Sequence, residues 1–139
     1  MSNPIFIDTS AIYAFLDGND ENHSSALEMV SIHATRGAAG EEHLVTHSGV
    51  VIETVALIAR RIGLEAVREF HNSVLPTIEV QWVAPSLYSR AMAALLAAGK
   101  RGISLVDWMS FEIMREHGID TAFAFDQDFS DQGFTVYTG

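Results

Sequence analysis

Four acidic residues stand inside or directly after hydrophobic runs of this chain, where a carboxylate without a partner is costly to bury. They are Asp8, Glu53, Asp107 and Asp126, with Asp128 two residues beyond the last. A cation shared by these side chains would offset that cost. Carboxylate oxygens suit hard divalent ions such as Mg2+ and Mn2+, and a bound ion of this kind can activate water. The four acids, with Asp128 as an optional fifth ligand, therefore predict one shared metal site.

Each acid also has a purely structural interpretation. Asp107 stands three residues after Ser104, which is the spacing of a helix capping box. Asp8 can cap the helix that follows it, and Asp126 can hold a turn. Glu53 can pair with an arginine. The shared site is favoured because all four structural explanations would have to hold together in one short chain.

The composition is typical of one folded domain. The chain has 139 residues, of which 48% are hydrophobic and 19% charged, so we expect a single domain over residues 1–139. The absence of cysteine excludes disulfides and thiolate ligands. No apolar run reaches the length of a membrane span and the polar start does not resemble a signal peptide, so the cytoplasm is the expected location. The net charge of -10 argues against broad, nonspecific nucleic-acid binding, which depends on basic surface. It does not exclude a nuclease, because an acidic active site contributes to that charge.

Short strands and longer helices alternate along the sequence. The strands are expected at 5–8, 44–46, 78–83, 121–125 and 134–137. The helices are expected to begin near residues 11, 24, 48, 64, 85 and 104. Strands that are separated by helices imply a mainly parallel sheet with helices on both faces. The predicted fold class is therefore α/β.

The predicted elements bring the acids toward one place. Asp8 and Asp126 each fall at the carboxyl end of a predicted strand, and ligands of open parallel sheets bind beyond those ends. Glu53 lies on an otherwise apolar helix face, and Asp107 lies in the first turn of its helix. We expect these side chains to converge at the carboxyl edge of the sheet.

Other polar and aromatic residues carry weaker signals. Two basic pairs are candidates for contacts with a substrate, although cations near helix ends explain them equally well; the four residues are Arg60, Arg61, Lys100 and Arg101. The six histidines lack zinc-type spacing, and we expect ordinary surface positions for them. Trp108 can stack on a base, but packing between helix and sheet is the preferred interpretation for both Trp108 and Trp82.

Three segments in order carry a family resemblance: Ile5–Ser10, Ser104–Asp107 and Phe125–Phe129, followed by Gly133 and Phe134. With a glutamate in mid-chain, this set resembles the PIN domain over essentially the whole chain. Within that superfamily it is most similar to the VapC-type toxins of bacterial and archaeal toxin–antitoxin pairs. The resemblance implies a three-layer α/β/α sandwich whose acids bind Mg2+ or Mn2+ and which cleaves RNA as an endoribonuclease.

The resemblance also assigns roles to individual residues. Asp8, Glu53, Asp107 and Asp126 match the four family acids, Asp128 takes a more variable position with at most an auxiliary role, and Ser10 matches a small hydroxyl residue near the metal. The implied partners are an RNA substrate, a cognate antitoxin and a second copy of the chain. For the apolar part of the helix after Asp8, core packing is the default and a dimer face or antitoxin groove the alternative; the residues are Ile12, Tyr13, Phe15 and Leu16.

Two alternatives to a nuclease were weighed. Many relatives carry threonine where this chain has Ala124, and together with the low basic content this keeps open a non-catalytic PIN module that binds RNA or protein. A phosphoacceptor receiver domain also places acids at strand ends. It requires a second acid beside Asp8 and a lysine at a late strand end, whereas the only lysine is Lys100, outside any predicted strand. The receiver domain is therefore rejected.

Overall fold

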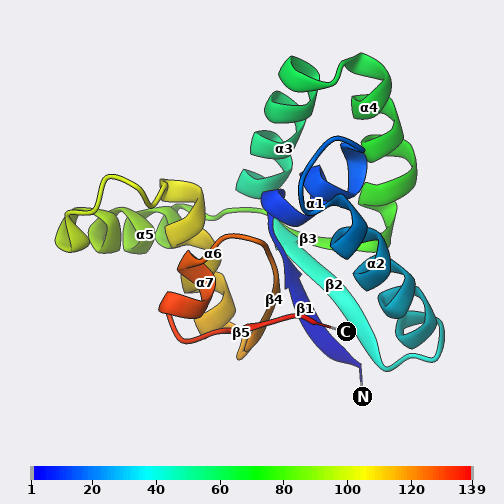
Figure 1. Cartoon of the computed structure of the whole chain (residues 1–139). Coiled ribbons are helices and arrows are strands. Elements are labelled where there is room, and N and C mark those ends of the chain that lie inside the picture. Colours follow the sequence, from blue (N-terminus) through cyan, green and yellow to red (C-terminus); the bar gives the residue numbers. More distant parts are fainter. Residues whose placement is uncertain (1, 139) are drawn as a thin grey trace.

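The computed structural model describes residues 2–138, and its centre is a five-stranded sheet in the order β3-β2-β1-β4-β5. Every neighbouring pair of strands is parallel. The strands are β1 (Asn3–Ile7), β2 (Glu42–His47), β3 (Ile78–Gln81), β4 (Thr121–Phe123) and β5 (Thr135–Val136). Because all strands run the same way, their carboxyl ends meet at one edge of the sheet (Figure 1).

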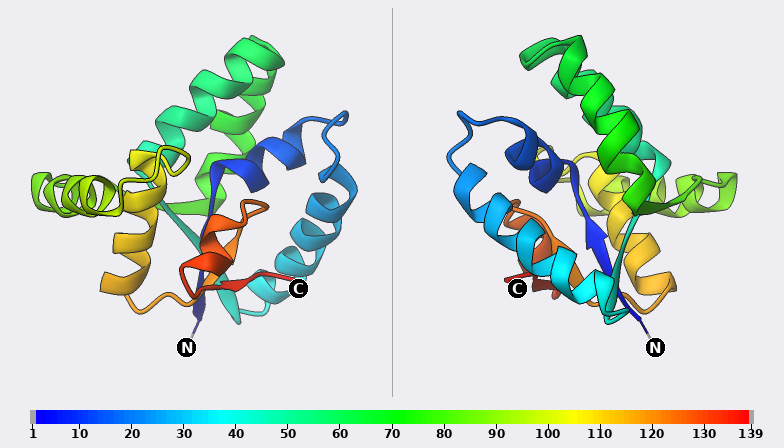
Figure 2. Two further views of the ribbon diagram at one scale, coloured as in Figure 1. Left: turned by 60° about the vertical axis from the view of Figure 1, so that its left-hand side comes forward. Right: turned by 90° about the vertical axis from the view of Figure 1, so that its right-hand side faces the viewer.

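Helices cover both faces of this sheet. One layer holds α1 to α4 and the other holds α5 to α7, as the views in Figures 1 and 2 show. The helices are α1 (Thr9–Leu16), α2 (His23–Ala38), α3 (Ser48–Arg61), α4 (Leu64–Glu69), α5 (Pro85–Ala98), α6 (Leu105–Glu116) and α7 (Asp128–Asp131). The expected α/β fold with three layers is confirmed. Within the described residues, no helix combines the length and hydrophobicity that a membrane span requires.

Alternation along the strands divides the core between the two layers. Phe6 points toward α6 and α7, where its ring lies 6.1 Å from that of Phe129. Phe111 of α6 packs edge-on against Phe129 at 5.1 Å. The neighbouring Ile7 faces the opposite layer, where it shares a hollow with Val30 of α2. The sheet is thus buried on both sides, as parallel sheets usually are.

Several elements differ from the expectation. The helix expected to begin near residue 64 changes at Phe70–Val74 into a π-helical turn, followed by a 3-10 turn over Leu75–Thr77. The strand expected at 121–125 ends at Phe123. Helix α7 was not expected, because four residues are too few to show a helical period.

The expectation for Trp82 was wrong, whereas that for Trp108 is confirmed. Trp108 is buried within α6, but Trp82 is 77% exposed. The cause is the position of β3 at the edge of the sheet. The chain leaves that strand after Gln81, so no element covers Trp82 on its way to α5.

Candidate metal centre

Asp8 stands at the junction of β1 and α1, directly beyond the carboxyl end of the central strand. Its backbone N–H donates to the carbonyl of Phe123 at 3.0 Å, which ties it to the end of β4. Its side chain is 97% buried by neighbouring atoms, with only 3% of the residue exposed. Oδ2 accepts hydrogen bonds from the backbone N–H and the hydroxyl of Ser10, at 3.2 and 2.7 Å. Oδ1 is buried without a partner.

Ser10 joins the ends of two strands. Its hydroxyl donates to Asp8 and accepts from the backbone N–H of Phe125 at 3.0 Å. A serine hydroxyl carries one hydrogen, so this geometry fixes which oxygen of Asp8 is occupied. The other oxygen, Oδ1, has no hydrogen-bond partner.

Asp107 forms the capping box that its spacing predicts. Its backbone N–H donates to the Ser104 hydroxyl at 3.2 Å, and one carboxylate oxygen accepts from the Ser104 N–H at 3.4 Å. This structural role does not remove it from the site, because capping engages only Oδ2. Asp107 lines the same pocket as Asp8.

Glu53 reaches the site from α3. The next residue, Thr54, is fully buried and donates to the hydroxyl of Thr9 at 3.2 Å. This contact holds α3 against the start of α1, one residue from Asp8. Glu53 itself is partly buried and lines the acidic pocket.

The four acids of the predicted site thus surround one pocket of about 370 Å³ at the carboxyl edge of the sheet. Other polar side chains complete its wall, and sequence reasoning missed three of them: Tyr13, Asp20 and Asn22. Five acids line the pocket: Asp20 and the four predicted ones, Asp8, Glu53, Asp107 and Asp126.

Asp128 does not line the acidic pocket but lies beside two of its acids. One carboxylate oxygen each from Asp107, Asp126 and Asp128 lie within 4.8 Å of one another. The Asp128 backbone N–H also donates to Oδ1 of Asp126 at 2.9 Å, which is the turn expected for Asp126. The short helix α7 begins at Asp128 and so brings this third carboxylate to the group.

The electrostatics of the cluster favour bound protons. Burial raises the pKa of Asp8 to about 6, against the opposing hydrogen bonds from Ser10, and the charges of Glu53 and Asp126 add to the rise. Burial raises the pKa of Asp107 to about 7, with further contributions from Asp8 and Asp126. Burial and Asp126 also raise the pKa of Asp128. The negative charges repel one another in this partly desolvated pocket, and this repulsion favours a positive charge bound among the carboxylates.

The donor set fits a hard divalent cation. All the clustered ligand atoms are carboxylate oxygens, which is the preference of Mg2+ and Mn2+. The unpartnered Oδ1 of Asp8 supplies a buried oxygen that no protein group satisfies. A cation at this place would compensate both the orphaned oxygen and the mutual repulsion.

The basic residues divide into those near the acids and those away from them. Arg61 lines the acidic pocket, and its guanidinium carbon lies 5.7 Å from the centre of the Tyr13 ring. Lys100 and Arg101 line a neighbouring hollow of about 390 Å³ that also includes Ser104. The exposed Arg60 does not line the acidic pocket.

Comparison with known protein families identifies the family of this chain. The family model described as the PIN domain matches residues 5–134. The chain belongs to the PIN-domain family. The predicted resemblance is therefore confirmed, and the acidic pocket lies where a PIN domain's family acids were expected to gather.

The relatives with the same fold include toxins. The chain is 34% identical over 131 residues to the 23S rRNA-specific endonuclease VapC20 of Mycobacterium tuberculosis, over 94% of this chain and 95% of that protein. The crystal structure of VapC20, described as a sarcin-ricin loop cleaving toxin, matches with a TM-score of 0.79 at 32% identity, over 94% of this chain and 96% of that one.

Two more distant structures share the fold of this PIN domain. VapBC2 of Rickettsia felis, bound to a DNA fragment from its promoter, matches with a TM-score of 0.69 at 12% identity, over 96% of this chain and 97% of that chain. FitAcB of Neisseria gonorrhoeae matches with a TM-score of 0.64 at 16% identity, over 96% of each chain.

The expectation of a surface position was wrong for His47. This residue ends β2 and is fully buried, with its ring 5.9 Å from that of Phe6. The physical reason is that both ring nitrogens find partners: Gly49 and Val50 donate to Nδ1, and Nε2 lies 2.9 Å from the hydroxyl of Ser110. The available signal was its place between an apolar strand and a helix start, where a polar residue can act as cap.

Proposed function

We propose that this chain is a metal-dependent endoribonuclease that hydrolyses RNA phosphodiester bonds and acts as the toxin of a VapBC-type toxin–antitoxin pair. The observation that carries the proposal is that the four predicted carboxylates line one pocket, in a chain 34% identical to a 23S rRNA-specific endonuclease. The charge and burial of that pocket suit a divalent cation far better than an acid–base pair working alone.

The proposed ligands of Mg2+ or Mn2+ are Asp8, Glu53, Asp107 and Asp126, with Asp128 as an additional carboxylate. An ion held by these residues would supply activation of water and stabilisation of charge on the phosphoryl and leaving oxygens. Ser10 keeps one oxygen of Asp8 occupied and thereby directs Oδ1 into the site. The capping box fixes the first turn of α6 and with it the position of Asp107.

Local cations would hold the substrate. Arg61 stands on the wall of the acidic pocket, against the face of Tyr13, and is placed to contact a phosphate beside the scissile bond. Lys100 and Arg101 would contact the RNA backbone further along. With a net charge of -10, the rest of the surface repels RNA. Recognition would therefore depend on a few contacts and on the shape of the target, and ribosomal RNA is the substrate to test first.

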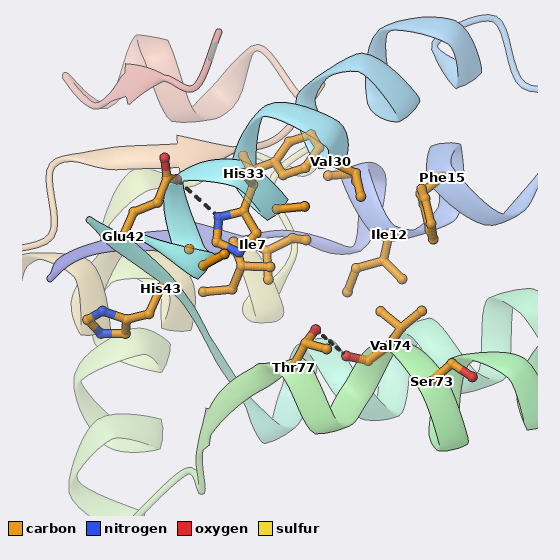
Figure 3. Close-up of a pocket in the computed structure, with 16 residues that line it drawn as sticks. Ile7, Ile12, Phe15, Val30, His33, Glu42, His43, Ser73, Val74 and Thr77 are labelled. Carbon is orange, nitrogen blue, oxygen red and sulfur yellow. Dashed lines mark hydrogen bonds and ion pairs between the residues drawn. The ribbon is translucent and has the colours of Figure 1, made fainter. Parts of the chain in front are cut away.

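The proposed antitoxin site is an apolar groove of about 510 Å³ between α1, α2 and the turns at 70–77 (Figure 3). Helix α2 and the turns at 70–77 form its walls, and Ile12 and Phe15 of α1 lie along it. Tyr13 of the same helix lines the acidic pocket instead. An apolar antitoxin segment in the groove can therefore continue past α1 to the acids.

We also propose that the toxin is a homodimer. Ile52 on α3 is 65% exposed, and the exposed Trp82 adjoins the same helix, because Val83 donates its N–H to the Ser48 hydroxyl at 3.0 Å. A second copy would remove this apolar surface from water. Light scattering of the wild-type protein and of Ile52→Arg measures the oligomeric state. A dimeric wild type and a monomeric variant are expected.

RNA cleavage in Mg2+ or Mn2+ tests the nuclease. The wild-type chain is expected to cut ribosomal RNA and to lose that activity in EDTA, whereas Asp8→Asn is expected to be inactive. The matched control is Asp120→Asn, the same chemical change at an exposed position before β4. A wild-type chain that binds RNA with Mn2+ present but leaves it intact would instead support the non-catalytic PIN module.

A further inference from the structure

The only fully buried histidine among the described residues connects three elements of the metal centre. His47 ends β2, caps α3 and bonds α6. Helix α3 carries Glu53 and α6 carries Asp107, so two of the four acids come from helices that meet at this ring. Neither His47 nor its partner Ser110 lines the acidic pocket.

The hydrogen bonds fix the state of the imidazole. Nδ1 accepts from the N–H groups of Gly49 and Val50, at 3.0 and 3.4 Å. The Ser110 hydroxyl donates its single hydrogen to the Val106 carbonyl at 2.9 Å, so it must accept from Nε2. The ring is therefore neutral, with its proton on Nε2. Burial agrees, since it lowers the pKa of His47 to about 4.

Packing leaves the ring no room to move. A Cβ at Gly49 would stand 2.8 Å from Cε1 of His47 and 2.9 Å from the terminal carbon of Met109. The first turn of α3 thus lies close against both the imidazole of His47 and the Met109 side chain of α6.

The link reaches the residue before Asp107. The Ser110 hydroxyl accepts a hydrogen bond from Nε2 of His47 and donates one to the carbonyl of Val106. Val106 immediately precedes Asp107, so the chain of hydrogen bonds ends in the same helical turn as that carboxylate.

We infer, on the basis of the proposed function, that His47 is a positioning residue which holds Glu53 and Asp107 at the spacing that metal binding requires. It does not touch substrate or metal. It acts through the cap on α3 and through Ser110 on α6, and its loss relaxes the site without removing a ligand.

Mn2+ titration of folded variants tests this role. Ser110→Ala cuts the bond to α6, and His47→Asn retains an acceptor for the α3 cap but cannot reach Ser110. Each is expected to raise the Kd for Mn2+ about tenfold, the order seen when groups behind metal ligands are lost. The double variant is expected to match the single ones, because both remove the same link.

The control is Tyr137→Phe, which deletes another buried hydrogen bond, to Glu42, at the opposite end of the sheet. It lowers thermal stability but is expected to leave the Kd for Mn2+ unchanged. Where His47→Asn fails to fold, Ser110→Ala and Gly49→Ala decide, because Gly49→Ala displaces the ring while keeping every polar group. Folded variants that bind Mn2+ as tightly as wild type would overturn the inference.

Amide NMR of the metal-free protein separates this inference from the proposed function. Ser110→Ala is expected to shift the backbone amides of Glu53 and Asp107, and Tyr137→Phe is not. A wild type that binds no Mn2+ would refute the metal-dependent nuclease, while the amide shifts would still decide whether His47 positions the two acids. Unchanged amides at both positions would refute the positioning role by themselves.

Discussion

One buried acid stands at each end of the same sheet, and the surroundings of the two acids are opposite. At the amino end, Glu42 is 5% exposed at its side chain and is surrounded by donors: His33 at 3.1 Å, Arg36 at 3.6 Å and the Tyr137 hydroxyl at 3.1 Å. At the carboxyl end, Asp8 has one oxygen without any partner and like charges around it.

This difference in surroundings indicates that the acid at the amino end stabilises the fold, whereas the acids at the carboxyl end serve function. A buried carboxylate with donors and cations around it fastens strands and helices together. A buried carboxylate that has an unpartnered oxygen and lies among other acids is a cost to the fold, which is justified when an external ligand supplies positive charge. The pocket at the carboxyl end therefore has the properties of a binding site, and Glu42 those of an internal support.

The strongest way to break this comparison is to remove an acid from the pocket. Asp107→Asn is expected to lower RNA cleavage by more than about 100-fold, because even groups behind metal ligands are worth about 10 to 100-fold. It is not expected to destabilise the metal-free protein, since it deletes one of several repelling charges. Cleavage rates and thermal melts measure the two effects. Retained activity would show that Asp107 serves only as a helix cap.

Glu42→Gln is the converse change. It removes the charge that faces His33 and Arg36 and is expected to cost about 2 kcal/mol of stability, reduced from the value for a fully buried pair because Arg36 is 41% exposed. Mn2+ affinity is expected to stay within twofold of wild type. Urea denaturation and Mn2+ titration measure these quantities, and a large loss of metal affinity would contradict the separation of the two ends.

The pH dependence of the free energy of unfolding provides a further test of the acidic pocket in the metal-free protein. The folded-state pKa of Asp8 is about 6 and that of Asp107 about 7, both raised from 3.8, so the folded chain binds more protons than the unfolded chain between these values. Their contribution to the free energy of unfolding is therefore complete below about pH 3.8 and is lost as pH rises toward 7.

His47 contributes in the opposite direction, because its pKa falls from 6.5 to about 4 and folding excludes its proton. Its contribution is present above pH 6.5 and is lost as pH falls toward 4.

Comparing the stability of wild type and Asp107→Asn as a function of pH isolates the contribution of Asp107. The wild type is expected to lose more stability than the variant on going from pH 5 to pH 7, and Mn2+ is expected to reverse that loss. Parallel curves for the two proteins would contradict the raised pKa of Asp107.

The smallest expected effect concerns the wall of the acidic pocket. Arg61→Ala is expected to raise the KM for RNA about threefold to tenfold, the range of one modest charged contact of about 1 kcal/mol. Arg60→Ala is the matched control, since Arg60 is the adjacent cation of α3 and does not line the pocket. Equal effects of the two changes would show that Arg61 contributes only general charge.

Much of the fold and of the cluster could be predicted because the signals are local. Asp8 and Asp126 follow apolar strands, and the geometry of parallel sheets then brings both to one edge. Asp107 could be placed in the first turn of its helix because Ser104, three residues earlier, gives the spacing of a capping box. The alternation of strands and helices was sufficient to predict the three layers.

The missed features depend on partners far away in the sequence. His47 can be buried because Ser110, 63 residues later, accepts a hydrogen bond from its Nε2. Glu42 was placed in a loop, yet it begins β2 and is enclosed by Tyr137, 95 residues away. Trp82 looked like a core residue, and only the edge position of its strand explains its exposure. No local pattern contains these pairings.

The strand order also bears on when the acidic pocket first exists during synthesis. Asp8 is held through Phe123 and through Ser10, whose partner Phe125 follows it by 115 residues. Strand β4 must therefore emerge and join β1 before Asp8 and Asp126 can meet. A nascent chain has no complete pocket until β4 has been translated, so a nuclease of this design would stay inert until then.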